Sequence, residues 1–193
     1  QRFFHWYLEF PEVLGGEKEE RGFDVVLGNP PWDKVQVEEQ PFFVNIYPEI
    51  ALASGSERKN KIKELEKNDP KTWEAWVIYQ NMIEGKIVFL KNSKYKKSSF
   101  GKFNSYSIFT ELADHLISKN GKGGLVVQSG IISDKSTQEL FTYLMSNNKL
   151  DVFIDFVNSR GIFPDVHRNL HFGLLVIDGS SSCYKSQFCL NCK

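Results

Sequence analysis

Asn29-Pro30-Pro31-Trp32 is the segment whose residue types point most directly to chemistry. Asn29 can offer its side-chain oxygen and Pro30 its carbonyl oxygen as hydrogen-bond acceptors. Proline donates no backbone hydrogen and has a fixed φ, so the segment is stiff and presents acceptors only. Two acceptors aimed at an exocyclic amine, such as that of adenine, would draw its nitrogen toward tetrahedral geometry and free its lone pair for attack on a methyl sulfonium. Trp32 offers a flat face on which an extruded base can stack.

The element that must position this segment is the apolar, β-branched run at residues 23–28. Such a run fits a strand buried on both faces, and the two prolines after it forbid its continuation. Open α/β sheets place their ligand sites at the carboxyl ends of strands, where this segment falls. The alternative is a plain turn, since Asn-Pro and Pro-Pro are ordinary loop dipeptides. The strand before the segment and the aromatic residue in it favour a site.

Further elements follow in an order typical of α/β proteins. Residues 33–103 form an irregular stretch with two helical patterns, at 56–68 and 72–84. After residue 104, the sequence predicts a helix at 106–119, a glycine turn at 120–124, a strand at 125–128, a helix at 136–146, and strands at 150–157 and 172–177. We therefore expect an α/β fold with a mostly parallel sheet and an antiparallel C-terminal hairpin at one edge.

Composition sets outer limits on what the chain can be. A length of 193 residues with 41% hydrophobic residues fits one domain with a buried core. The 24 basic and 24 acidic residues balance, so net charge favours no class of partner. No apolar run approaches the ~20 residues of a membrane-spanning helix. The odd number of cysteines, three, does not suggest a disulfide framework. We expect a cytoplasmic protein with no membrane partner.

Residues 85–102 contain six lysines and no acid, with aromatic residues between them. Cations suit phosphates and rings suit unstacked bases, so this stretch suits a nucleic-acid backbone. The alternative is a solvated lysine-rich loop. With the motif pointing the same way, we predict DNA contacts from Lys91, Lys94, Lys96, Lys97 and Lys102.

Three other patterns could suggest metal chemistry. Asp69 with Glu84-Gly85-Lys86 imitates the acid pattern of metal-dependent nucleases, but Asp69 lies between two helical stretches and not on a strand. His167 and His171 lead into a strand, and ordinary polar contacts are the better interpretation. The three cysteines include one C-x-x-C pair but lack a clear fourth ligand. We predict no metal site.

The segment GFDVVLGNPPW at 22–32 resembles motif IV of the N6-adenine DNA methyltransferases. FHWYLEFPEV before it, and the later spacing, resemble fused (type IIG-like) restriction-modification enzymes and related phage-defence methylases. NSYSIFTELADHL and GKGGLVVQSGIISD are similar to the family's next helix and strand, and GIFPDVHRNLHFGLLVI to its late motif. By that match, Phe163 would face a flipped base from the side opposite Trp32. The alternative for Phe163 is a core or hairpin aromatic.

The resemblance, which extends roughly from His5 to Asp178, implies a partial Rossmann-like fold of the S-adenosylmethionine-dependent methyltransferases. It implies methyl transfer from S-adenosylmethionine to a flipped adenine in double-stranded DNA, with Asn29, Pro30, Pro31 and Trp32 as catalytic residues. Only about two dozen residues precede the motif, too few for the family's cofactor loop at roughly 30 residues per βαβ unit.

We therefore expect residues 1–193 to be the target-base part of a catalytic domain, with an inserted helical and basic region at about 33–103. Its partners would be the missing N-terminal and specificity regions of the parent protein. The chain alone is not expected to methylate, and an exposed apolar edge beside the first strand would favour self-association. Two other functions stay open: methylation of a protein glutamine or ribosomal RNA guanine nitrogen, and a non-catalytic DNA-binding fragment.

Overall fold

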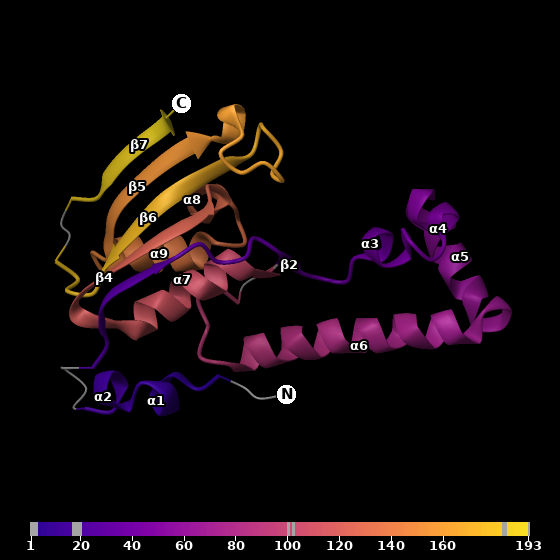
Figure 1. The fold of residues 1–193 in the computed structure, drawn as a ribbon, viewed down its shortest axis with the longest axis horizontal. Helices are drawn as coiled ribbons and strands as arrows, with labels where there is room; N and C mark the ends of the chain where they lie inside the picture. The colour runs from indigo at the N-terminus through magenta and orange to yellow at the C-terminus, as the bar shows by residue number, and fades with distance from the viewer. Residues whose placement is uncertain (1–3, 17–20, 100, 102, 183–184, 193) are drawn as a thin grey trace. The chain divides into compact units, whose positions relative to one another are not determined.

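Strand β1 (Phe23–Gly28) ends directly before Asn29, as the sequence predicts. The computed structural model describes residues 4–16, 21–99, 101, 103–182 and 185–192. It places β1 in a five-stranded sheet (Figure 1). The strand order is β1-β4-β6-β5-β7, and the other members are β4 (Ile117–Gln128), β5 (Leu150–Val157), β6 (His171–Asp178) and β7 (Gln187–Cys192).

Four of these strands run in one direction. β1 pairs with β4 in parallel, and β5 pairs with β7 in parallel, whereas β6 is antiparallel to both β4 and β5. The predicted α/β class, with a mostly parallel sheet and an antiparallel hairpin, is confirmed. The hairpin is not at the edge, however, because β6 lies between β4 and β5, and β7 lies outside β5. Four carboxyl ends, those of β1, β4, β5 and β7, therefore lie along the same end of the sheet. The antiparallel strand β6 begins at that end.

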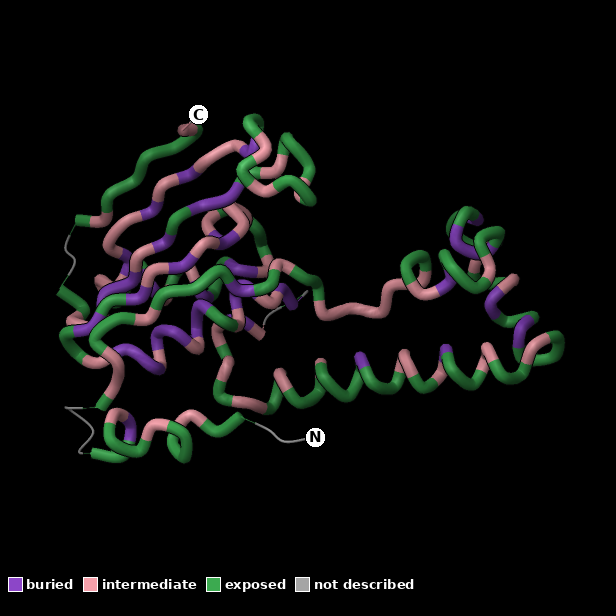
Figure 2. The backbone as a smooth tube through the Cα atoms, viewed as in Figure 1, coloured by how far each residue is buried: buried purple, intermediate pink, exposed green. Residues whose placement is uncertain are grey.

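Helices cover one face of this sheet. α7 (Ser105–Leu116) and α9 (Gln138–Ser146) pack their buried side chains into the same core cluster as β4, β5 and β6. Figure 2 shows buried residues along these strands and along α7. The remaining elements of this part are short: α1 (Trp6–Glu9), α2 (Pro11–Leu14), β2 (Lys34–Val35), β3 (Phe103–Asn104), α8 (Gly130–Ser133) and the 3-10 helix η1 (Asn158–Arg160).

Strand β1 is not buried on both faces, and that prediction is wrong. Val25 is 58% exposed and Leu27 is 78% exposed, whereas Val26 packs against the core. The reason is that β1 pairs with β4 alone among the described strands, and α7 contacts it from the face of Val26. The expected exposed apolar edge beside the first strand is confirmed.

The glycine-rich segment at 120–124 is part of β4 and not the predicted turn, and α7 ends at Leu116 instead of residue 119. Two glycines of the 120–124 segment explain why it forms a strand and not a turn. Each lies where a neighbouring strand leaves no room for a side chain. A Cβ on Gly121 would lie 2.3 Å from the carbonyl oxygen of Phe23, and one on Gly123 would lie 2.6 Å from Ile177. These glycines serve close strand packing.

Val35–Lys94 forms a second compact unit, where the length alone predicted one domain. It lies within the stretch at 33–103 that the sequence analysis predicts to be an insertion. Its helices are α3 (Glu39–Phe43), α4 (Pro48–Leu52), α5 (Gly55–Asn68) and α6 (Pro70–Asn92). They bury a core of their own, which includes Phe43, Ile62 and Trp76. Asp69 caps α6 by accepting from the amide of Thr72 at 3.3 Å.

Helix α6 continues eight residues past the predicted end at residue 84, and residues 86–92 contain no Gly or Pro that would end it. Among the described residues, no helix has both the length and the apolar character needed to cross a membrane.

We predict opposite effects for two glycine-to-alanine substitutions. Gly121→Ala should lower the free energy of unfolding by roughly 1–3 kcal/mol, because its Cβ meets backbone that cannot move aside. Gly85→Ala lies in α6 with open space around its Cβ, so it should raise stability by up to about 1 kcal/mol. Urea unfolding followed by circular dichroism measures both. A Gly121→Ala chain as stable as wild type would contradict the packing described for β4.

We predict that the chain self-associates through the exposed residues of β1. Light scattering over a range of concentrations should show an average mass above that of the monomer, and Leu27→Lys should reduce it because a charge resists burial. Leu52→Lys is the matched control, since Leu52 is 83% exposed but lies in the other unit. A clean monomer at every concentration would count against this prediction.

Candidate active site

The motif residues line one pocket together with Phe163. This pocket has a volume of about 310 Å³ and is lined by Asn29, Pro30, Pro31, Trp32, Phe163 and Val166. The first four follow β1, and the last two belong to the segment between β5 and β6. The fold thus brings together residues more than 130 positions apart, at the sheet edge where four strands end. The volume lies at the lower end of the range of small-ligand pockets.

Asn29 and Pro30 differ in how they are held. Asn29 is exposed, and its carboxamide makes no hydrogen bond to any residue in the described part of the chain. Its oxygen is therefore available to accept from a ligand. Pro30 is buried, which fixes the direction of the backbone at this point. One acceptor is thus adjustable and the other is rigid.

Trp32 is fixed by its own polar atom. The indole Nε1 donates to the carbonyl of Val126 in β4 at 3.2 Å, and the half-buried ring packs against the main core cluster. A Trp N–H needs a partner when it is buried, so this bond settles the ring orientation. The remaining ring surface contributes to the pocket wall.

Phe163 lies against Trp32 and not across a gap from it. The two ring centroids are 5.4 Å apart at an interplanar angle of 71°, and Phe163 also meets Phe172 edge-on at 5.0 Å. Phe172 in turn stacks on Trp32 at 6.4 Å. An edge-to-face pair leaves no space for a third ring between its members. A base stacked between Trp32 and Phe163 therefore requires the Phe163 ring to move.

A second pocket on the same sheet edge is polar. It has a volume of about 510 Å³, and Asp155 is one of the residues that line it. The Asp155 carboxylate accepts from Ser129 and from the amide of Asn191, and lies 3.2 Å from Nδ1 of His171. Burial raises the pKa of Asp155, but the hydrogen bonds from Ser129 and His171 outweigh it and lower that pKa overall. Asp155 joins the ends of three strands, and sequence analysis did not single it out.

A third pocket, of about 310 Å³, lies beside the motif and is mainly apolar. Its lining residues come from β1 and the motif, from α7, and from Trp6 and Leu125. No acidic residue is among the described residues that line it.

The predicted lysine surface is distributed over different elements. Lys91 lies in the last turn of α6 and Lys94 ends the second unit, while Lys96 and Lys97 begin the return to the first. Lys102 lies outside the described residues.

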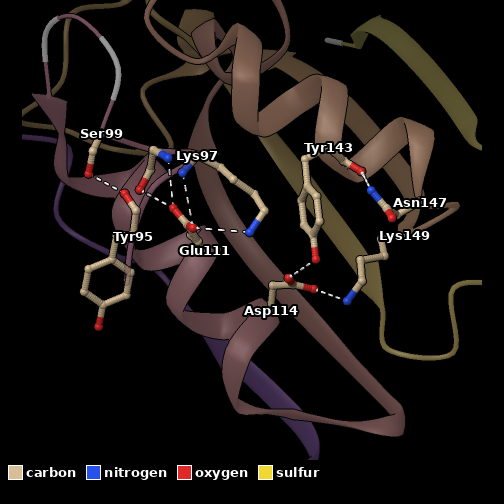
Figure 3. A network of polar contacts seen from close by, with 9 residues as sticks. Tyr95, Lys97, Ser99, Glu111, Asp114, Tyr143, Asn147 and Lys149 are labelled. Atoms are coloured by element: carbon tan, nitrogen blue, oxygen red, sulfur yellow. Dashed lines mark hydrogen bonds and ion pairs between the residues drawn. The ribbon is translucent and has the colours of Figure 1, made fainter. Parts of the chain in front are cut away.

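Lys97 is engaged within its own unit, as Figure 3 shows. Its Nζ lies 3.6 Å from Oε1 of Glu111 and 4.1 Å from the ring centre of Tyr143. Glu111 has 0% exposure and also accepts from the amide and hydroxyl of Ser98, at 2.8 and 2.6 Å. This carboxylate holds the segment that enters α7, and a role for Lys97 in stability stands beside the predicted DNA contact.

A neighbouring network in Figure 3 joins α7 to α9 and the segment before β5. Asp114 accepts from Lys149 at 2.5 Å and from the Tyr143 hydroxyl at 2.9 Å. Burial raises the pKa of Tyr143, and the negative charge of Asp114 raises it further. The hydroxyl therefore stays protonated and donates at neutral pH.

The other patterns, as far as the structure describes their residues, do not assemble a metal centre. Asp69 caps α6, and Glu84 and Lys86 both lie inside that helix. His167 accepts from the amide of Asn169 at 3.2 Å. The Sγ atoms of Cys189 and Cys192 are 3.0 Å apart, and Cys183 lies outside the described residues. Within the part of the chain that is described, no three His, Cys, Asp or Glu side chains converge in a way that could hold a metal ion.

Comparison with known proteins finds a sequence family that matches part of the chain. Residues 75–163, somewhat less than half of the chain, match the sequence family described as Eco57I restriction-modification methylase. The match supports a methyltransferase role in a restriction-modification system, and it ends at Phe163 without including Asn29. No curated protein sequence matches the chain significantly.

Several solved structures resemble the fold at low identity. A candidate class I S-adenosylmethionine-dependent methyltransferase from Listeria monocytogenes shares 10% identity with a TM-score of 0.44, over 88% of this chain and 37% of that one. The DrdV–DNA complex shares 13% with a TM-score of 0.48, over 90% of this chain and 15% of that one. A modification subunit of a candidate type I restriction enzyme from Vibrio vulnificus YJ016 shares 14% with a TM-score of 0.43, over 91% and 26%. The chain spans well under half of each.

We predict that Glu111→Gln lowers the free energy of unfolding by roughly 1–3 kcal/mol, because the substitution removes the charge opposite Lys97 and leaves buried donors poorly matched. Glu139→Gln in α9 is the control, since Glu139 is exposed and should change stability little. Urea unfolding of both variants gives the comparison. Equal midpoints for the two variants would show that the Glu111 network does not stabilise this unit.

Proposed function

We propose that this chain is the target-base part of a DNA adenine-N6 methyltransferase from a restriction-modification or phage-defence enzyme that uses S-adenosylmethionine. The observation that carries the proposal is the single pocket formed by Asn29, Pro30, Trp32 and Phe163 at the carboxyl end of β1. The match of residues 75–163 to restriction-modification methylases supports the same class independently, because that segment lies outside the Asn29 motif.

Asn29 and Pro30 would activate the amine. The Asn29 carboxamide oxygen and the Pro30 carbonyl each accept one hydrogen of the adenine N6 group, so the nitrogen lone pair leaves the ring system and becomes nucleophilic. No base with a shifted pKa is needed, because the amine proton can pass to solvent after attack. Since Pro30 is buried and Asn29 is exposed, the backbone acceptor would set the position of the amine and the side chain would adjust to it.

Trp32 and Phe163 would hold the extruded base. Removal of a base from the duplex costs a few kcal/mol in lost stacking and pairing. Stacking on an aromatic ring returns on the order of 1–3 kcal/mol, which is of the same size. The indole of Trp32 suits this role because its hydrogen bond to Val126 fixes the ring plane before the base arrives.

S-adenosylmethionine would supply the methyl group, but the described residues do not make a complete site for it. The mainly apolar pocket beside the motif is the nearest space to Asn29, and no acid among its described lining residues could bind the ribose hydroxyls or the ammonium group. The chain also spans only part of each similar structure. The donor site would therefore be completed by a further segment, and methylation by these residues alone is not expected.

DNA would be held through its phosphates by Lys91, Lys94, Lys96 and Lys102. Lys97 would contribute less to DNA binding than its place in the lysine run suggests, because its charge already faces Glu111. Contacts of this kind weaken as salt concentration rises, in proportion to the number of phosphates neutralised. The DrdV structure, which contains DNA, is compatible with such a partner.

The decisive experiment measures methyl transfer with and without Asn29. The chain is extended upstream through a cofactor-binding half, and tritiated methyl incorporation from S-adenosylmethionine into mixed-sequence duplex DNA is assayed. Asn29→Ala should lower the rate by about 10²-fold or more, by analogy with the loss of one preorganised hydrogen-bonding group in other active sites. Asn147→Ala, which alters an exposed amide after α9, should leave it unchanged.

The identity of the labelled product separates the alternatives. N6-methyladenine that disappears in Asn29→Ala supports the proposal. Label in protein or RNA would mean that the methyltransferase fold acts on another substrate. Measurable cofactor binding with no incorporation into any substrate would favour a non-catalytic DNA-binding role.

A further inference from the structure

Asn158 is a buried residue whose side-chain hydrogen bonds, among the described residues, all go to the loop that carries Phe163. It follows β5 directly, has 0% exposure, and begins η1. Its Nδ2 donates to the carbonyls of Phe163 at 3.0 Å and Val166 at 2.9 Å, and its Oδ1 accepts from the amide of Phe163 at 3.0 Å. Both carboxamide hydrogens and the oxygen are therefore used.

The two residues that Asn158 holds are the two residues that this loop contributes to the motif pocket. The loop at 158–170 lies between β5 and β6 and consists largely of half-buried and exposed residues, so little hydrophobic packing fixes its path. Gly161, with φ of 69°, allows the chain to reverse around the carboxamide. An apolar side chain of similar size could fill the space, but it would leave three backbone groups unpaired.

Asn158 acts on the backbone of Phe163 and leaves the ring unbonded. Among the described aromatic rings, it meets those of Trp32 and Phe172, both edge-to-face. Such aromatic pairs are worth about 0.5–1.5 kcal/mol beyond area burial. The three hydrogen bonds of a buried amide cost more to break together. Ring rotation is therefore the easier way to make room beside Trp32, and displacement of the loop is the harder one.

We propose that Asn158 is a positioning residue for the flipped base: it fixes the backbone at Phe163 and Val166, so that the base enters by rotation of the Phe163 ring while the loop stays in place. This inference rests on the proposed function. It differs from a purely structural role for Asn158, because it requires that loss of the carboxamide weakens the stacking of the extruded base.

The first measurement needs no activity. Hydrogen exchange is measured for the loop amides of the 193-residue chain as it stands, in wild type, Asn158→Ala and Asn147→Ala. The Phe163 amide should exchange at least about tenfold faster in Asn158→Ala, equivalent to about 1.4 kcal/mol of lost protection, and should be unchanged in Asn147→Ala. Asn158→Ser, which keeps one small hydrogen-bonding group, provides a second variant if the alanine variant does not fold. Unchanged exchange of the Phe163 amide in both Asn158→Ala and Asn158→Ser would overturn the proposal.

The second measurement tests whether substitution of Asn158 alters the stacking of the extruded base. In the chain extended upstream, duplex DNA carries 2-aminopurine in place of the target adenine, and stacking of the extruded base on Trp32 quenches its fluorescence. Asn158→Ala should lose most of the quenching and lower kcat about 10- to 100-fold, with KM for S-adenosylmethionine unchanged. Phe163→Leu should also reduce quenching. Hydrogen exchange of the amides in the 158–170 loop should stay slow in this variant, because Asn158 is present.

The outcomes separate this inference from the proposed function. Faster exchange in Asn158→Ala with wild-type quenching and kcat would make Asn158 a structural residue only, and the inference would be wrong while the proposed function stands. If the wild-type protein itself methylates no DNA, the proposed function is wrong. The proposal that Asn158 positions a flipped base is then wrong as well. Fast loop exchange in Phe163→Leu would show that the ring, and not Asn158, holds the loop.

Discussion

The insertion of β6 between β4 and β5 is the constraint on which the site depends. Because β6 runs against both neighbours, it begins at the edge where they end, and the loop before it must return across that edge. That return carries Phe163 to Trp32, which β1 has delivered to the same edge. Gly173 makes the pairing feasible, since a Cβ there would lie 2.3 Å from the ring of Phe153.

Buried polar side chains hold the joints between elements of the first unit. Glu111 binds the segment that enters α7, Asp114 joins α7 to α9, Asp155 joins the ends of three strands, and Asn158 shapes the loop before β6. Each has several partners, as burial of a polar group requires. The apolar core holds the helices against the sheet in this unit, and these four side chains fix the segments that connect helices and strands. The candidate site is formed by two connecting segments, the one after β1 and the one between β5 and β6.

The motif separates two different environments. On one side, Asn29 and Pro30 line a pocket together with the aromatic residues Trp32 and Phe163. On the other, a mainly apolar pocket and the exposed side chains of β1 form a surface that a methyl-donor site would have to complete. Under the proposed function, the base would be activated on the first side of the motif, and the methyl donor would bind on the second. The proposed reaction would then need both sides, because the amine and the methyl group would have to meet at the motif.

The sequence alone determined the strand at 23–28, the acceptor motif after it, the strand at 150–157 and the α/β class, because these depend on local apolar patterns and on the backbone limits of proline. It also indicated Phe163 through resemblance to a family motif. Only the tertiary structure decided the burial of β1, the extended path of the glycines in β4, the engagement of Lys97 with Glu111 and the hydrogen bonds of Asn158. Each of these depends on which strand or helix lies beside the residue. An asparagine after a strand reads as an ordinary turn residue until the fold shows which backbone groups its carboxamide meets.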